Sequence, residues 1–195
     1  MIAKEVAMPR SGGSFRGLVS YLTSDRGKAE RVGHVQLSNC LSDDDVAGVV
    51  LEVRNTQARN GRAWHTTYHL ILSFREEPSV EVLGAIEERA CAVLGFGHHQ
   101  RVSVVHHDTD HLHLHVAINR ACPKTHRVQC PSYSKFALDR LCVELERDYG
   151  LQPDNHRTLV EEDRLQAMDA LRTLAQTECQ LQTLGLQDVS VCQFQ

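Results

Sequence analysis

The part of this chain that is most informative about its fold is the stretch His106-His107-Asp108-Thr109-Asp110-His111-Leu112-His113-Leu114-His115-Val116-Ala117-Ile118-Asn119-Arg120. It holds five of the chain's twelve histidines. Apolar runs typical of strands lie on both sides of its Asp-Thr-Asp segment, at 102–105 and 112–118, and that segment is rich in turn-forming residues. The stretch therefore predicts a β-hairpin that carries histidines.

Side chains alternate across a strand, so His113, His115, Ala117 and Asn119 share one face of the predicted second strand, and the intervening leucine, valine and isoleucine side chains share the other. The turn should return a histidine or carboxylate from the end of the first strand beside His113 and His115. Three such side chains suit a divalent ion with open coordination positions. The alternative is a surface hairpin that is rich in histidine by chance, and the pattern alone leaves the reaction open.

Length and composition indicate one domain. The 195 residues, 42% of them hydrophobic, can bury one sizeable core. The seven cysteines are scattered and form no C-x-x-C pair, which favours reduced thiols over a disulfide framework. With no secretory signal and no long apolar window, we expect a soluble, cytoplasmic protein without membrane insertion.

The net charge of −4 is unevenly distributed. Residues 1–40 and 96–140 each carry +3, whereas residues 41–95 carry −4 and residues 141–195 carry −6. The basic portions hold the motifs described here, so an anionic substrate is expected there if the fold brings them together.

Hydrophobic periodicity predicts an α+β fold. The expected strands are 2–8, 33–40, 66–75 and the two arms of the hairpin, and the expected helices are 14–27, 42–59, 78–95, 134–149 and 159–184. We expect a mainly antiparallel sheet covered by helices on one face, with the other face left for an ion and its substrate. A C-terminal helical tail follows, and its close at Gln195 suggests that a longer region continues beyond it.

Three motifs resemble those of conjugative relaxases, members of the HUH (His-hydrophobic-His) endonuclease superfamily. Tyr21, within residues 15–22, resembles the tyrosine of their first motif, and residues 68–75 resemble the second. His106-x-Asp108-x-x-x-x-His113-x-His115-x-x-x-Asn119 resembles the third. The similarity is greatest to the TraI-type relaxase of broad-host-range plasmids, in the P mobilisation family. It implies a relaxase domain over residues 1–158, with 159–195 as the C-terminal extension.

The resemblance implies a role for each motif. Tyr21 would be the nucleophile that forms a 5′-phosphotyrosyl bond with DNA at a plasmid transfer origin, and His113 and His115 would be metal ligands. His113 is also counted as catalytic. We assign the third ligand to His106, with His107 as the rival, and expect Asp108 to orient a histidine. Imidazoles suit Mn²⁺ or Zn²⁺ by donor softness, whereas the family implies Mg²⁺ or Mn²⁺.

The expected partner is single-stranded plasmid DNA, together with accessory relaxosome proteins and a coupling protein. Ser73 is expected near the cleaved bond, and Phe74 or Trp64 is expected to stack a base. We expect phosphate contacts from seven basic residues, Arg10, Arg16, Lys28, Arg31, Arg120, Lys124 and Arg127.

Two other interpretations stay open. A replication initiator or transposase of the same superfamily would use a tyrosine after the His-x-His motif, such as Tyr133 or Tyr149. A non-catalytic, metal-dependent DNA-binding module would bind the origin without cutting it.

Overall fold

The structure is a computed structural model that describes residues 1–8, 13–25, 27, 31–60, 65–107 and 111–154. Its elements, in chain order, are β1 (Ile2–Val6), α1 (Phe15–Thr23), β2 (Val32–Ser38), α2 (Val46–Ala58), β3 (Thr67–Phe74), α3 (Val80–Val93), β4 (Arg101–His106), β5 (Leu112–Asn119) and α4 (Ser134–Tyr149). The predicted hairpin is confirmed as β4 and β5. The predicted last helix and the 158/159 boundary lie outside the described residues.

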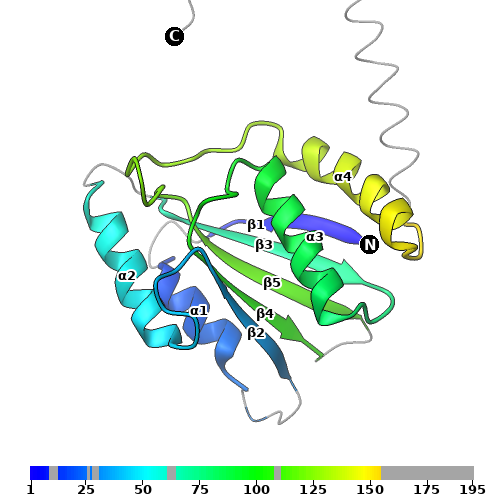
Figure 1. The fold of residues 1–195 in the computed structure, drawn as a ribbon, viewed down its shortest axis with the longest axis horizontal. Helices are drawn as coiled ribbons and strands as arrows, with labels where there is room; N and C mark the ends of the chain where they lie inside the picture. Colours follow the sequence, from blue (N-terminus) through cyan, green and yellow to red (C-terminus); the bar gives the residue numbers. More distant parts are fainter. Residues whose placement is uncertain (9–12, 26, 28–30, 61–64, 108–110, 155–195) are drawn as a thin grey trace, which may run out of the picture. The chain divides into compact units, whose positions relative to one another are not determined.

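The five strands form one sheet in the order β1-β3-β5-β4-β2, and every neighbouring pair is antiparallel. Figure 1 shows them side by side, with the hairpin strands inside the sheet. The predicted antiparallel α+β fold is thereby confirmed.

Three helices begin at a side-chain cap. Ser14 accepts a hydrogen bond from the backbone N–H of Gly17, Asp45 from that of Ala47, and Ser79 from that of Val82, which satisfies amide donors that have no partner within the helix. The acidic run before α2 therefore acts as a cap, and α2 begins at Val46, four residues later than the predicted start.

Opposite faces of the sheet meet different helices. The face that carries Leu70, Leu72 and Phe74 packs in one apolar cluster with residues of α3 and α4. The other face packs its Val102, Val104 and Ala117 against α1 and α2. Figure 1 shows α1 lying between α2 and the β4–β2 side of the sheet.

The prediction that helices cover only one face is therefore wrong. On the second face, β4 and β5 carry the polar residues His106, His113, His115 and Asn119, and their remaining positions are valine and alanine. Those apolar side chains must be removed from water, and Phe15, Leu18 and Leu22 of α1 with Val49 and Val53 of α2 cover them.

Candidate active site

The predicted metal ligands share one sheet face. His106 on β4 is opposite His113 on β5, and His113 is opposite Ser73 on β3. Directly opposed residues point to the same side of an antiparallel sheet, so these three side chains form a row across the central strands. His115 is two residues further along β5 and points the same way.

The imidazole rings are close neighbours. The ring centroids of His106 and His115 are 4.4 Å apart, and those of His113 and His115 are 6.1 Å apart. His106 is buried, whereas His113 and His115 are half-buried. His107 follows β4, is exposed, and has its Nδ1 atom 3.9 Å from the Glu77 carboxylate. The geometry thus favours His106 over His107 as the third metal ligand.

His69 of β3 joins this cluster and was not among the predicted site residues. Its Nε2 atom is 3.1 Å from Nδ1 of His115. Burial, with a smaller contribution from His106, lowers the pKa of His69 from 6.5 to about 4, so its imidazole is neutral near pH 7. The sequence did hold a signal, because His69 is four residues before Ser73 and therefore lies on the same face of β3.

Tyr21 lies near the end of α1, and that end contacts the histidine cluster. The carbonyl oxygen of Leu22 is 2.7 Å from Nε2 of His106. The Tyr21 side chain is 41% exposed, and the Arg31 guanidinium carbon lies 5.2 Å from its ring centroid. The residue next to the predicted nucleophile therefore touches a predicted metal ligand that is more than eighty positions away in sequence.

The rival tyrosines belong to α4. Tyr133 caps its start and is 87% exposed, and Tyr149, its last residue, packs against the apolar cluster of the opposite sheet face. Neither position favours an attack on a phosphate held at the histidines.

The residues fit a divalent ion in donor type. Three imidazoles meet on one face, but Nε2 of His106 is within hydrogen-bonding distance of Leu22 and its Nδ1 atom is 3.4 Å from Arg31. Within the described part of the chain, no group of three or more His, Cys, Asp or Glu side chains is arranged to hold a metal ion. His106 would have to exchange one of these contacts to become a ligand.

The predicted DNA contacts have different outcomes. Ser73 is half-buried beside His113. The prediction for Phe74 is wrong, because this ring is 1% exposed in the core of the opposite face, where it cannot stack on a base. The alternation of the strand explains the difference, since adjacent residues point to opposite faces.

Arg120 follows β5, and its guanidinium donates to the Gln129 carbonyl oxygen and contacts the Cys130 sulfur. Its role on DNA stays a prediction. Arg31 is 3% exposed, which contradicts a phosphate contact at the surface. Four further predicted residues, Arg10, Lys28, Trp64 and Asp108, lie outside the described residues.

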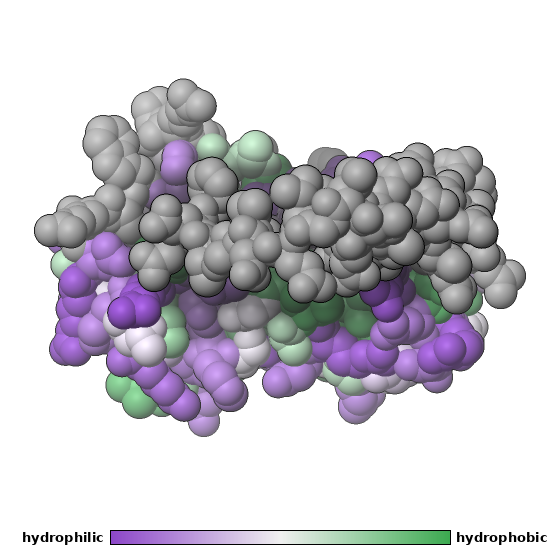
Figure 2. Space-filling view, turned by 90° about the horizontal axis from the view of Figure 1, so that it is seen from above, coloured by the Kyte–Doolittle hydropathy of each residue, from purple (hydrophilic) through white to green (hydrophobic). Residues whose placement is uncertain are grey.

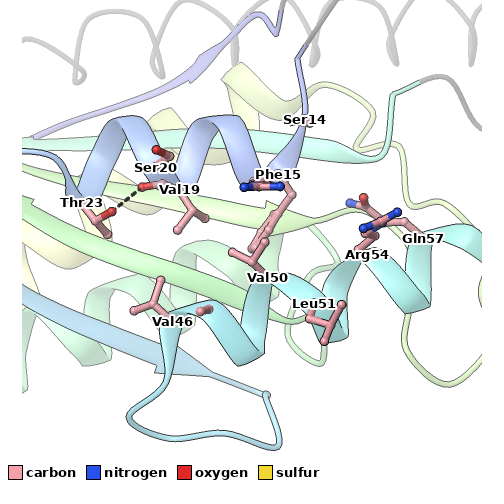
Figure 3. A pocket seen from close by; sticks show the side chains of 12 residues that line it. Ser14, Phe15, Val19, Ser20, Thr23, Val46, Val50, Leu51, Arg54 and Gln57 are labelled. Atoms are coloured by element: carbon pink, nitrogen blue, oxygen red, sulfur yellow. Dashed lines mark hydrogen bonds between the residues drawn. The ribbon is translucent and has the colours of Figure 1, made fainter.

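A hollow of about 870 Å³ lies between α1 and α2 (Figure 3). Val19, Val46 and Val50 contribute apolar walls, and Arg16 and Arg54 bring positive charge. None of the described residues that line it is acidic. The hollow is thus suited to an anionic chain with apolar groups, and it runs along the helix that bears Tyr21.

The described surface is mainly hydrophilic in the view of Figure 2. Hydrophobic residues form small areas among the hydrophilic ones. A search of the described residues finds no helix with the length and hydropathy needed to cross a membrane.

Comparison with known proteins assigns the class that this sheet and histidine cluster suggest. The sequence pattern of the family "Relaxase: MobA/VirD2-like, nuclease domain" matches residues 21–151, which is more than half of the chain. The chain belongs to this family of relaxase nuclease domains.

Particular relatives agree with that assignment. The chain is 51% identical over 160 residues to a Protein TraI of Escherichia coli, and these residues are 80% of this chain and 21% of the relative. It is 49% identical over 175 residues to another Protein TraI of Escherichia coli, with 87% and 24% covered. Protein MobA of Acidithiobacillus ferrooxidans is 42% identical over 69 residues, with 34% and 17% covered. The recognition of a TraI-type relaxase is confirmed, and the chain spans less than a quarter of either TraI protein.

Proposed function

We propose that this chain nicks and rejoins one DNA strand at a plasmid transfer origin during conjugation. Tyr21 is the nucleophile, and the intermediate is DNA joined through its 5′ phosphate to the tyrosine ring. The observation that supports this most directly is the contact between the Leu22 carbonyl and His106, because it brings the helix end that bears Tyr21 to the histidine cluster.

The proposed reaction conserves a phosphodiester bond. The Tyr21 oxygen bonds to phosphorus, the bond to the 3′ oxygen breaks, and the proton lost by the phenol is balanced by the one that the 3′ oxygen takes up. Rejoining is the reverse attack by a 3′ hydroxyl on the phosphotyrosine. Because no water is consumed, the strand can be resealed without another energy source.

The histidine cluster has the donor groups that this reaction needs. His106, His113 and His115 would hold the divalent ion, for which Mg²⁺ and Mn²⁺ are the first candidates and Zn²⁺ the third. Bound there, the ion supplies positive charge to the non-bridging phosphate oxygens. Ser73, which is in register with His113, would hydrogen-bond the same phosphate group. Asp108 is assigned to orient one of the histidines.

His69 supports the orientation of His115. As a neutral imidazole, His69 can accept a hydrogen bond from the Nδ1–H group of His115, which leaves the Nε2 lone pair of His115 for an ion. This is the usual arrangement around ligating histidines, where the second ring nitrogen is held by another acceptor.

The incoming strand is single-stranded, and we assign the hollow between α1 and α2 to part of it. Arg16 and Arg54 would meet phosphates, while the valine walls would contact a base or sugar (Figure 3). Accessory relaxosome proteins and a coupling protein complete the proposed set of partners, in the cytoplasm.

The test is incubation of the full chain with single-stranded transfer-origin oligonucleotides and Mn²⁺, followed by denaturing gel electrophoresis. A protein–DNA band that survives denaturation, and that the Tyr21→Phe variant lacks, is the expected result. Cutting without such a band would identify a metal-dependent hydrolase instead. Binding without cutting would identify an accessory DNA-binding module.

A further inference from the structure

Arg31 occupies an unusual position for a charged residue. It immediately precedes β2, whose first residue, Val32, is in register with His106. The carbonyl oxygen of Arg31 accepts a hydrogen bond from the backbone N–H of His107, at 3.1 Å. The backbone of Arg31 is therefore fixed to the end of β4, and its side chain is almost entirely buried.

The guanidinium group meets both halves of the proposed active site. Its Nη1 atom donates to the carbonyl oxygens of Tyr21, at 3.3 Å, and Ser24. Its Nη2 atom is 3.4 Å from Nδ1 of His106. Its central carbon lies over the Tyr21 ring. One side chain thus contacts the predicted nucleophile through backbone and ring, and contacts a predicted metal ligand at the same time.

His106 also contacts the last turn of α1 directly. Its Nε2 atom is 2.7 Å from the Leu22 carbonyl oxygen, and its Nδ1 atom is 3.4 Å from Arg31. These contacts join the last turn of α1 to the end of β4.

A helix cap alone explains only part of this arrangement. A cation near the carbonyl end of a helix is favourable, and the last turn of α1 contains no basic residue of its own. Capping requires contacts with carbonyl groups, however, and it requires neither the approach to the Tyr21 ring nor the contact with His106. The additional contacts bear on where the phenol lies relative to the histidines.

We propose that Arg31 is a positioning residue for the nucleophile, an inference that rests on the proposed function. It holds the Tyr21 backbone and ring against the histidine cluster, so that the phenol oxygen meets the phosphate with little rearrangement. Loss of this side chain slows the attack and leaves DNA binding largely intact.

The experiment compares Arg31→Met, Arg31→Lys and Arg89→Met with the wild-type chain. Oligonucleotide affinity is measured by fluorescence anisotropy in EDTA, and adduct formation by single-turnover gels at saturating DNA with Mn²⁺. Arg31→Met should slow adduct formation on the order of 10²-fold, because misplacement of a reacting group by about 1 Å has that effect, while its affinity stays close to wild type. Arg31→Lys should recover part of the rate. Arg89→Met, on α3 and paired with Asp148 and Glu144 outside the proposed site, should leave both the affinity and the rate unchanged.

A measurement without DNA completes the test. Amide hydrogen exchange in the peptide that contains Tyr21 should rise in Arg31→Met and stay unchanged in Arg89→Met, because Arg31 donates to the carbonyl oxygens of Tyr21 and Ser24 and Arg89 lies on α3. If Arg31→Met does not fold, Arg31→Lys is compared with wild type in the same assays.

The results distinguish a positioning role for Arg31 from a DNA contact and from failure of the proposed function. Wild-type adduct formation with an unchanged rate in Arg31→Met would overturn the inference and leave the proposed function standing. Equal losses of affinity and rate would identify Arg31 as a DNA contact and also overturn it. If the wild-type chain forms no adduct, the proposed function is overturned. If amide hydrogen exchange in the Tyr21 peptide is also unchanged in Arg31→Met, the positioning role is overturned as well.

Discussion

The two faces of the sheet show how one set of strands serves two purposes. On the face toward α3 and α4, Leu70, Leu72 and Phe74 are at most 1% exposed and belong to a continuous apolar core. On the opposite face, the same β3 strand presents His69 and Ser73 beside the histidines of β4 and β5. The pleat of a strand therefore places side chains for stability and side chains for chemistry at alternate positions of the same segment.

The difference between the faces makes neighbouring residues matched controls for one another. Substitution on the apolar face should lower the free energy of unfolding, because it leaves a cavity in a packed core. Substitution on the histidine face should lower the reaction rate with a much smaller effect on folding.

The largest effect is expected from the pair His115→Ala and Leu114→Ala. His115→Ala removes a proposed ion ligand and should slow adduct formation on the order of 10²- to 10³-fold, as loss of a charge-stabilising group does. Leu114→Ala should lower the free energy of unfolding by about 2–5 kcal/mol and retain the rate per folded molecule. Single-turnover gels and urea denaturation measure the two quantities. A similar rate loss in both variants would contradict the separation.

The pair Ser73→Ala and Phe74→Ala applies the same logic to β3. Phe74→Ala should lower the free energy of unfolding by about 3–5 kcal/mol, because its ring is fully buried in the core. Ser73→Ala should change it by about 0.5 kcal/mol or less, while slowing adduct formation. Urea denaturation followed by circular dichroism provides the comparison. Equal destabilisation by the two substitutions would be the contrary result.

Lowering the pH should lower the free energy of unfolding, because His69 on the histidine face resists protonation in the folded chain. The pKa of His69 is lowered from 6.5 to about 4 in the folded chain, so between these pH values the unfolded chain binds more protons. The stability is full above pH 6.5 and falls as the pH drops toward 4, with a loss from this residue of roughly 3 kcal/mol at most. Urea denaturation in EDTA at several pH values should give a flatter profile for His69→Gln. A profile as steep as that of wild type would exclude His69 as the source.

The smallest effect is expected from surface arginines on the two sides of the molecule. Arg54→Gln in the hollow between α1 and α2 should weaken oligonucleotide binding and reduce its salt dependence by about 0.7 in the logarithmic slope, as loss of one phosphate contact on a single strand does. The control is Arg89→Gln on α3, where the arginine pairs with Asp148 and Glu144. Anisotropy titrations at several NaCl concentrations measure both. If the affinities of Arg54→Gln and wild type have the same salt dependence, the hollow does not bind the DNA strand.

Local sequence patterns predicted the hairpin, the shared face of His113 and His115, and the cap residue of α1, because each depends on residues close together in the chain. The alternation of side chains along a strand could not decide between His106 and His107 as the third metal ligand. The answer depends on where β4 ends and how it pairs with β5. Arg31 was misassigned to the surface because its burial arises from contacts with α1 and β4 that no local pattern encodes. The helical cover over Val102 and Val104 was not predicted, because the nearly continuous apolar run at 102–105 does not show which faces of the strand are covered by helices.

The tyrosine whose helix ends against the histidine cluster should become bonded to DNA. The four tyrosines of the chain fall in four different tryptic peptides, and Tyr21 lies in the peptide of residues 17–26. Mass spectrometry of trypsin- and nuclease-digested adduct should find the nucleotide on that peptide alone. A nucleotide on the peptide that contains Tyr133 or Tyr149 would contradict the account.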